Sequence, residues 1–298
     1  MLEEPKYVVI SPVKNEGRYL QRTIESMVSQ TLLPILWLVV DDASTDGTGN
    51  LVKAAAARYP WIRYLLHPGE TARRTGSAEI HAFDYGHRTL QGIAYDFIVK
   101  LDGDLWFGPG YFEMLLARFS KNATLGIASG VYLEDSGSNW LAITMPSYHA
   151  AGASKVVRRE CFTQIGGFLA ERGWDTVDEI RARSKGWETA HFTDIEFCHL
   201  RKEGTGMGQL HTNLMHGEIF FRMRGGFPFF VLKAGRRMAL GKPFFLAGSA
   251  MIYGYFRALV RGLLGKQKPL VSPLEARTYR KMLNHRLLNH PLRGLKEG

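Results

Sequence analysis

The first hundred residues alternate short apolar runs with helix-like segments, and this alternation restricts the fold more than any other feature of the chain. Three runs have the length and composition of buried β-strands, at residues 7–10, 35–40 and 61–66. Segments with helical periodicity lie between them, at residues 18–30 and 49–59. Strands that alternate with helices form a parallel sheet with right-handed crossovers. We therefore expect an α/β protein.

A fourth apolar run, residues 97–101, ends directly before an acidic pair, Asp102 and Asp104. In open α/β sheets, ligands bind beyond the carboxyl ends of the strands. Two carboxylates at such a position can share a hard divalent cation, which in turn can hold a diphosphate. Asp-Gly-Asp is also a common turn composition, so the tripeptide alone leaves a simple turn open. Its position after a strand indicates a candidate site for a nucleotide-diphosphate ligand.

Two further acidic clusters belong to the same pattern. Asp41 and Asp42 follow the second apolar run, so a parallel sheet would bring them to the same edge as Asp102. A carboxylate there can accept hydrogen bonds from a base or a ribose, although Asp41 can equally cap the next helix. Asp175 and Asp178 begin a predicted helix and can supply a base that takes a proton from an attacking hydroxyl.

Several motifs, in order along residues 7–205, resemble the family 2 glycosyltransferases, whose nucleotide-sugar-binding domain is called GT-A. They are the Pro-x-x-Asn-Glu loop (Pro12, Asn15, Glu16), the Val-Asp-Asp element (Val39 to Thr48), the Asp-x-Asp (Asp102, Asp104), and Gly166-Gly-Phe168 followed by Asp175. The resemblance implies a GT-A-type α/β fold, with a mostly parallel central sheet flanked by helices. It also implies inverting, metal-dependent sugar transfer from a nucleotide diphosphate to an acceptor hydroxyl.

The resemblance assigns roles to individual residues. The metal, Mn²⁺ or Mg²⁺, would be held by Asp102, Asp104 and His199, although a histidine bonded to a backbone carbonyl is an open alternative for His199. The donor-binding residues would be Pro12, Asn15, Glu16, Asp41, Asp42, Asp84 and Asp102. Where the family usually has Glu-Asp, this chain has Trp174-Asp175. Asp175 is therefore our first choice for the base, with Asp178 as the alternative.

The resemblance also implies the kinds of substrate. The donor would be a UDP-, GDP- or dTDP-sugar, and the acceptor a saccharide or a lipid-linked saccharide used in cell-surface glycan or glycolipid synthesis. Asp84-Tyr-Gly86 stands where the family often has Asn-x-Gly, which leaves that sugar or phosphate contact open. A sugar-phosphate nucleotidyltransferase is the alternative enzyme. It would need a glycine-rich, basic phosphate loop, whereas residues 11–17 hold one glycine.

The carboxyl-terminal part of the chain carries all of its excess positive charge. Residues 1–221 contain 22 Lys and Arg against 26 Asp and Glu, whereas residues 222–298 contain 16 against 2. Large apolar residues interleave with these cations, and this combination favours an anionic membrane surface. The aromatic residues stand in Phe-rich runs rather than singly among Arg and Lys, so a nucleic-acid partner is the less favoured reading. We expect a catalytic domain at 1–221 and a basic, aromatic, helical membrane-associating extension at 222–298.

The apolar runs bear on where the protein acts. None reaches the roughly 20 residues of a membrane-spanning helix, and the longest, residues 243–256, suits an interfacial or a re-entrant segment. Residues 1–6 are polar and do not resemble a signal peptide. Cys161 and Cys198 form no disulfide framework. We therefore expect a cytoplasmic protein associated peripherally with the cytoplasmic membrane.

Overall fold

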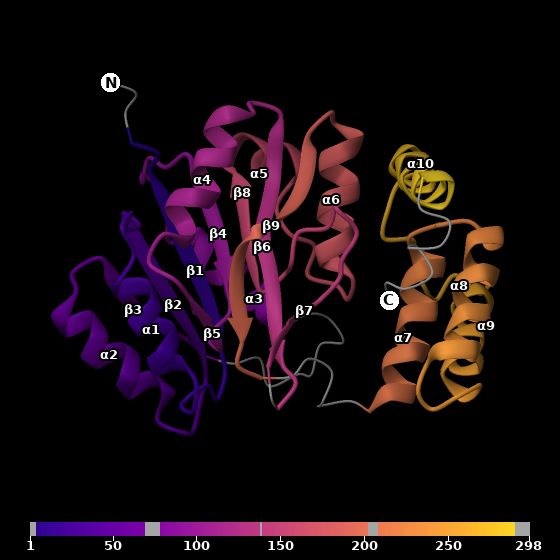
Figure 1. Cartoon of the computed structure of the whole chain (residues 1–298), viewed down its shortest axis with the longest axis horizontal. Helices are drawn as coiled ribbons and strands as arrows, with labels where there is room; N and C mark the ends of the chain where they lie inside the picture. Colours follow the sequence, from indigo (N-terminus) through magenta and orange to yellow (C-terminus); the bar gives the residue numbers. More distant parts are fainter. Residues whose placement is uncertain (1–3, 69–77, 138, 202–207, 290–298) are drawn as a thin grey trace. The chain divides into compact units, whose positions relative to one another are not determined.

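The computed structural model describes residues 4–68, 78–137, 139–201 and 208–289. Contacts between Cα atoms divide the chain into two compact units, Met1–Arg201 and Lys202–Gly298. The described strands all belong to the first unit, and the second is built from helices (Figure 1). Our predicted boundary lay at residue 221. The observed division instead assigns helix α7 (Gln209–Arg222) to the second unit.

Within the described residues of the first unit, nine strands form one mixed sheet in the order β3-β2-β1-β4-β8-β6-β9-β5, with β7 paired to β6. The strands are β1 (Tyr7–Val13), β2 (Leu36–Asp42), β3 (Ile62–His67), β4 (Phe97–Leu101), β5 (Leu105–Phe107), β6 (Leu125–Asp135), β7 (Trp140–Ala142), β8 (Ser154–Arg158) and β9 (Glu188–His199). Strands β3, β2, β1 and β4 run parallel, as the alternation of strands and helices predicted.

Helices flank this sheet and bury both of its faces (Figure 1). They are α1 (Leu20–Val28), α2 (Thr48–Arg58), α3 (Ala78–Arg88), α4 (Tyr111–Lys121), α5 (Arg159–Ile165) and α6 (Trp174–Ser184). Successive residues of a strand point to opposite faces. Val9 and Val99 accordingly enter one hydrophobic core, whereas Val8 and Ile98 enter the other. Burial on both faces explains why these strands are continuously apolar in sequence.

Strand direction decides which strand ends meet. Strand β8 runs antiparallel to both β4 and β6, and β9 runs parallel to β6. Strands β4, β6 and β9 therefore point the same way. Their carboxyl ends share one edge of the sheet with the carboxyl ends of β1 and β2. We call it the acidic edge, because Asp42, Asp102 and His199 stand at the ends of β2, β4 and β9.

The second unit consists of α7, α8 (Phe227–Leu240), α9 (Leu246–Leu263) and α10 (Pro273–Asn289). A Cβ atom at Gly217 of α7 would lie 1.9 Å from the carbonyl oxygen of Met251, and one at Gly254 of α9 would lie 1.9 Å from that of Leu214. Only glycine permits such close packing of two helices. The glycines of the 243–256 run therefore form helix contacts and do not interrupt α9.

The helices of the described residues were also compared with the length and hydropathy that a membrane span requires. None of them is both long enough and apolar enough to cross a bilayer.

Candidate active site

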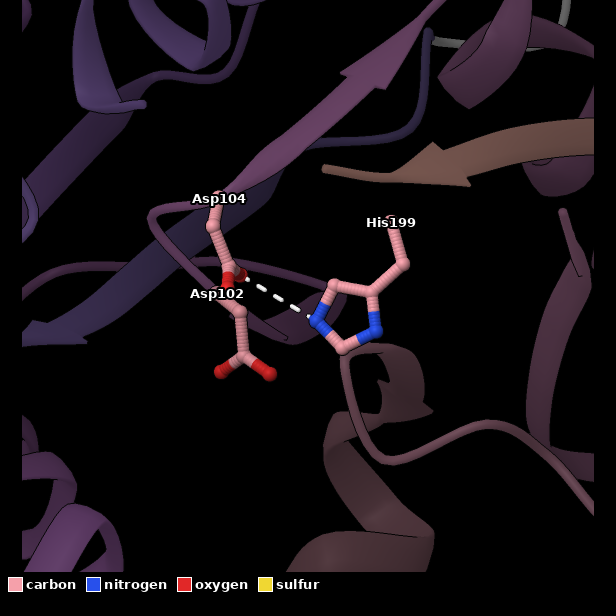
Figure 2. A group of neighbouring side chains, drawn as sticks. All are labelled: Asp102, Asp104 and His199. Atoms are coloured by element: carbon pink, nitrogen blue, oxygen red, sulfur yellow. Dashed lines mark ion pairs between the residues drawn. The ribbon is translucent and has the colours of Figure 1, made fainter. Parts of the chain in front are cut away.

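Three side chains from two distant chain segments meet at the acidic edge (Figure 2). Asp102 and Asp104 lie in the turn between β4 and β5, and His199 ends β9, where the strand register pairs it with Leu105. One ligand atom from each residue lies within 4.8 Å of the others. We call Asp102, Asp104 and His199 the metal cluster. The Nε2 atom of His199 is 3.3 Å from a carboxylate oxygen of Asp104. Carboxylate and imidazole groups together are suitable ligands for Mn²⁺, so these residues fit the metal that the resemblance implies.

The turn that carries the two aspartates is fixed by hydrogen bonds with Thr23 and by close packing against Val13. The Thr23 hydroxyl oxygen lies 2.9 and 2.8 Å from the carbonyl oxygens of Gly103 and Leu105, either of which can accept its single hydrogen, and it accepts the Leu105 N–H at 3.0 Å. A Cβ atom at Gly103 would lie 2.8 Å from the Val13 side chain, so the turn needs glycine there. The middle residue of Asp-Gly-Asp thus lets the loop pack against β1 and present both aspartates.

Two cations accompany the carboxylates of this cluster. Lys100 donates to Asp102 at 2.5 Å, and Arg201 pairs with both Glu16 and Asp104. Burial raises the pKa of Glu16 to about 7, and the negative charge of Asp104 adds to the effect. Burial likewise raises the pKa of Asp102, although Lys100 opposes the shift. The crowded carboxylates therefore favour an added positive charge at this edge.

Asp41, which we predicted to contact the nucleotide, points into the protein. Its side chain is buried, and its two oxygens accept hydrogen bonds from the Ser44 N–H at 2.9 Å and the Tyr64 hydroxyl at 3.0 Å. These bonds shape the loop after β2. As placed, Asp41 supports that loop. It does not cap the next helix, the alternative that its sequence position left open, because α2 begins without a side-chain cap.

Asp42 lies nearer the surface and has a lysine and a histidine as neighbours. Its oxygens are 3.1 Å from the Nζ atom of Lys14 and 2.8 Å from the Nδ1 atom of His67. Burial alone would raise the pKa of Asp42, but the hydrogen bonds from His67 and Lys14 outweigh it and lower the pKa. These contacts hold the Asp42 carboxylate in place near the surface of the acidic edge.

The Pro-x-x-Asn-Glu loop joins two loops of the acidic edge. Pro12 is buried in β1. The Asn15 N–H donates to the Ser44 hydroxyl at 2.9 Å, and the Asn15 side-chain oxygen accepts the Thr45 N–H at 2.8 Å. Asn15 adopts a left-handed backbone conformation with φ 56°, which asparagine tolerates better than most residues. Of these motif residues, Glu16 alone reaches the metal cluster, through Arg201.

Asp84 is not brought to the metal cluster. It lies within α3, where burial raises its pKa and the charge of Arg88 on the same helix opposes the shift. The residue of α3 that does reach the site is Glu79, whose carboxylate accepts a hydrogen bond from the Trp174 indole at 3.0 Å. Nothing in the sequence around Glu79 signalled this contact.

The two candidate bases differ in where their side chains point. Asp178 is fully buried, and both of its oxygens lie 3.1 Å from the Nζ atom of Lys155. Burial raises the pKa of Asp178, although Lys155 opposes the shift. Asp175 is partly exposed at the start of α6, with its Cβ atom close to the Gly152 backbone in the loop that leads into β8. Because that loop enters at the acidic edge, Asp175 can meet a substrate there, whereas Asp178 faces inward.

A tryptophan and two lysines connect the metal cluster with α6. Lys100 on β4 and Lys155 on β8 are register partners, and their Nζ atoms lie 5.3 and 5.2 Å from the Trp174 ring centroid. Lys155 also donates to the main-chain oxygen of Asp175 at 2.7 Å. The one sequence signal of this contact is Lys100, a lysine within the otherwise apolar run 97–101. We call Lys100, Trp174 and Lys155 the lysine bridge.

Comparison with known proteins identifies the family. The family model described as Glycosyl transferase family 2 matches residues 8–172, so the chain belongs to glycosyltransferase family 2. An N-acetylglucosaminyl-diphospho-decaprenol L-rhamnosyltransferase from Mycobacterium tuberculosis is 26% identical over 244 residues, which cover 66% of this chain and 77% of that protein. The protein is thus a glycosyltransferase, as its motifs predicted.

Solved structures with low sequence identity share the fold. A mannosyltransferase from Pyrobaculum calidifontis, solved with GDP-Man and Mn²⁺, has a TM-score of 0.57 and 17% identity, with coverage of 96% of this chain and 87% of that one. S. aureus TarS 1-349, solved with UDP-GlcNAc, has a TM-score of 0.55 and 15% identity, with coverage of 97% and 82%. These similarities confirm the predicted GT-A-type fold with its carboxyl-terminal helical extension.

Proposed function

We propose that this enzyme is a metal-dependent, inverting glycosyltransferase. It moves a sugar from a UDP, GDP or dTDP donor to a hydroxyl of a saccharide or lipid-linked acceptor in cell-surface glycan or glycolipid synthesis. The observation that carries the proposal is the convergence of Asp102, Asp104 and His199 at the acidic edge, beside the start of α6. The ligands of the two structurally similar proteins support the donor class, and the name of the mycobacterial relative supports a lipid-linked acceptor.

In this proposal, the metal cluster and its cationic neighbours stabilise the negative charge of the departing nucleotide diphosphate. Asp102, Asp104 and His199 would hold Mn²⁺ or Mg²⁺, and the bound ion supplies the positive charge that stabilises the leaving group. Arg201, bound to Glu16 and Asp104, adds a fixed positive charge at the same place. Lys100 holds the Asp102 carboxylate in position through its 2.5 Å hydrogen bond.

The loops at the ends of β1 and β2 bind the nucleotide in this proposal. Asp42 accepts hydrogen bonds from the base or ribose, because its carboxylate lies near the surface of the acidic edge. Asn15, Glu16 and Asp41 hold these loops in the required shape through the contacts described above. Pro12 contributes to the rigidity of β1, in which it is buried.

Asp175 acts as the base. It accepts the proton of the acceptor hydroxyl while the oxygen forms a bond to the anomeric carbon, and the bond from that carbon to the diphosphate oxygen breaks with its electron pair. One displacement inverts the configuration and needs no covalent enzyme intermediate. Asp178 is a positioning residue, since it fixes Lys155, which in turn holds the main chain at Asp175.

Product analysis tests this function. We would incubate the protein with UDP-, GDP- and dTDP-sugars and a lipid-linked saccharide acceptor, with and without Mn²⁺. We expect a nucleoside diphosphate and a glycosylated acceptor of inverted anomeric configuration, formed only with the metal. Pyrophosphate as the product would contradict the proposal and identify a nucleotidyltransferase.

We also propose that the second unit docks on the anionic, cytoplasmic face of a membrane as a peripheral anchor. Residues 222–298 hold 16 Lys and Arg against 2 Asp and Glu. The described helices and loops of this unit expose large apolar side chains, namely Phe227, Val231, Leu232, Leu240, Phe244, Phe245, Leu246, Tyr253, Phe256, Val260, Leu263 and Leu264. At such a membrane, the Lys and Arg side chains contact anionic lipid headgroups, and the apolar side chains enter the layer below the headgroups. The charge and the apolar surface of the second unit would then both contribute to docking.

A further inference from the structure

The second unit contains a cavity of about 580 Å³ that the proposed transfer chemistry does not use. Residues of α7 and α9 and of the segments that follow these two helices line most of it. Four apolar side chains of its lining, three of them aromatic, are those of Phe220, Phe221, Tyr255 and Leu259, and we call them its floor. A floor of this kind accommodates a hydrocarbon chain, because burial of apolar surface is favourable in proportion to its area.

Four cationic side chains belong to the lining of the same cavity, and we call them its rim. Arg222, Arg224, Lys268 and Arg280 line the cavity, and its described lining residues include neither Asp nor Glu. Arg222 donates to the Lys268 carbonyl at 3.1 Å, and Arg280 donates to the Arg224 carbonyl at 3.3 Å. These bonds fix two guanidinium groups of the rim. Guanidinium groups form strong, charge-assisted hydrogen bonds with phosphate.

The backbone of the rim adds to its preference for an anion. Arg224 adopts a left-handed conformation with φ 55°, and the turn continues through Gly226, with φ 95°, into α8. Helix α8 starts with no side-chain cap and no acidic residue in its first turn. A helix start of this kind favours a negative charge. The cationic side chains and the start of α8 therefore both favour an anion next to the apolar lining of the cavity.

We propose that this cavity binds one phosphate-bearing membrane lipid, with the phosphate on the arginine rim and a hydrocarbon chain along the aromatic floor. The inference deepens the proposed membrane docking, since it adds one specific, saturable lipid site to a general attraction for anionic surfaces. Charge complementarity selects the phosphate, and the apolar floor distinguishes a lipid from a free phosphate ion.

Binding of a soluble short-chain lipid to the full-length protein tests the site. Calorimetric titration with dioctanoyl phosphatidic acid, below its critical micelle concentration, should give one saturable site. Inorganic phosphate and dioctanoylglycerol should each bind at least about tenfold more weakly, because each offers only half of the recognised chemistry. Comparable affinity for inorganic phosphate would overturn the lipid assignment, and absence of a saturable site would overturn the proposal.

Three variants and a matched control locate the binding. Arg224→Gly removes a cation and retains a residue suited to positive φ, Arg280→Gln removes a second cation, and Leu259→Trp narrows the floor. Each should weaken phosphatidic acid binding by about tenfold or more. Lys281→Gln, at an exposed position next to Arg280 and outside the cavity lining, should leave it unchanged. Equal affinity in all four proteins would overturn the proposal.

Two further measurements separate specific lipid binding in the cavity from loss of folding and from general membrane docking. Thermal melting checks that each variant is folded. Sedimentation with phosphatidylcholine and phosphatidylglycerol vesicles reports general docking, which the single-site variants should retain because most of the 16 Lys and Arg remain. If the wild-type protein sediments with vesicles yet binds no short-chain lipid, the cavity proposal fails and the docking proposal stands.

Discussion

The two units of this chain use charge in opposite ways. In the first unit, functional charges are buried and paired: Lys155 and Asp178 are fully buried against each other, and Lys100 is buried beside Asp102. In the second unit, the excess charge is basic, and it accompanies apolar side chains that face outward, such as Phe244, which is 72% exposed. Buried, paired charges keep reacting groups in fixed positions, whereas exposed charges beside apolar groups form a surface for a large partner. The contrast indicates chemistry in the first unit and docking in the second.

Removal of the candidate base should give the largest effect and should be confined to the first unit. We expect Asp175→Asn to lower kcat by about 10²- to 10⁴-fold, because an amide cannot accept the hydroxyl proton. Donor binding, measured as KM for the nucleotide sugar, should change little. Asp194→Asn serves as the control, since Asp194 pairs with Arg118 at an exposed position. Full activity of Asp175→Asn would transfer the base role to another residue.

Loss of a buried lysine should have the next largest effect, and it sharpens the contrast between the units. Lys155→Met leaves Asp178 and Glu179 buried without their cation, which should destabilise the fold by about 3–5 kcal/mol. Lys233→Met, an exposed lysine of α8, should change stability by less than about 0.5 kcal/mol. Chemical denaturation measures both variants. Similar small effects would mean that the buried cluster is not a special feature of the first unit.

Membrane docking should depend on the exposed apolar residues of the second unit and not on those of the first. Phe244→Ser combined with Phe245→Ser should weaken vesicle binding by about tenfold or more, because two inserted aromatic side chains are lost. Trp140→Ser combined with Leu141→Ser removes two comparably exposed apolar residues from the first unit. That control should bind vesicles as the wild type does. If both pairs weaken binding equally, docking is not a property of the second unit.

A smaller effect concerns pH and a histidine of the buried cluster. His149 lies 3.1 Å from Glu179. Burial would lower the pKa of His149, but the charge of Glu179 and its hydrogen bond to His149, together with the charge of Asp175, outweigh burial and raise the pKa above its ordinary value of 6.5. The charge of Lys155 opposes the rise. The folded state therefore binds this proton more tightly, so the stabilisation is fully present below pH 6.5 and is lost as pH rises through the folded-state pKa.

We expect His149→Gln to lower the free energy of unfolding by about 1 kcal/mol near pH 5.5 and by less near pH 9. Denaturant titrations at both pH values measure the difference. His211→Gln, at an exposed position on α7 in the second unit, should show no such pH dependence. A larger loss at high pH would reverse the assigned sign.

The parallel half of the sheet was predictable because its strands are buried on both faces and read as apolar runs. Strand β9 was not predicted, since its exposed and buried residues follow no regular period and its register shifts where it pairs with β6. Strand β5 has three residues, too few for a pattern. These two strands depend on pairing with distant partners, which local sequence does not encode.

The residues of the candidate site likewise divide into those that local sequence could predict and those that it could not. Asp102 and Asp104 could be singled out because they follow a predicted strand, and His199 could be singled out because the family resemblance assigned it to the metal. The lysine bridge could not, because it requires the antiparallel register that pairs Lys100 with Lys155. Asp178 was a reasonable candidate base by position, but only the rotation of α6 about its axis reveals that it faces inward.

Nucleotide binding tests the central claim most directly, namely that the acidic edge holds a divalent metal and a nucleotide diphosphate. Calorimetric titration of UDP, GDP and dTDP would be performed with and without Mn²⁺, on the wild type and on Asp104→Asn. We predict that at least one nucleotide binds the wild type tightly only with Mn²⁺, and that Asp104→Asn loses this metal-dependent binding. Nucleotide binding that depends on neither Mn²⁺ nor Asp104, or no binding of any of the three, would contradict the account.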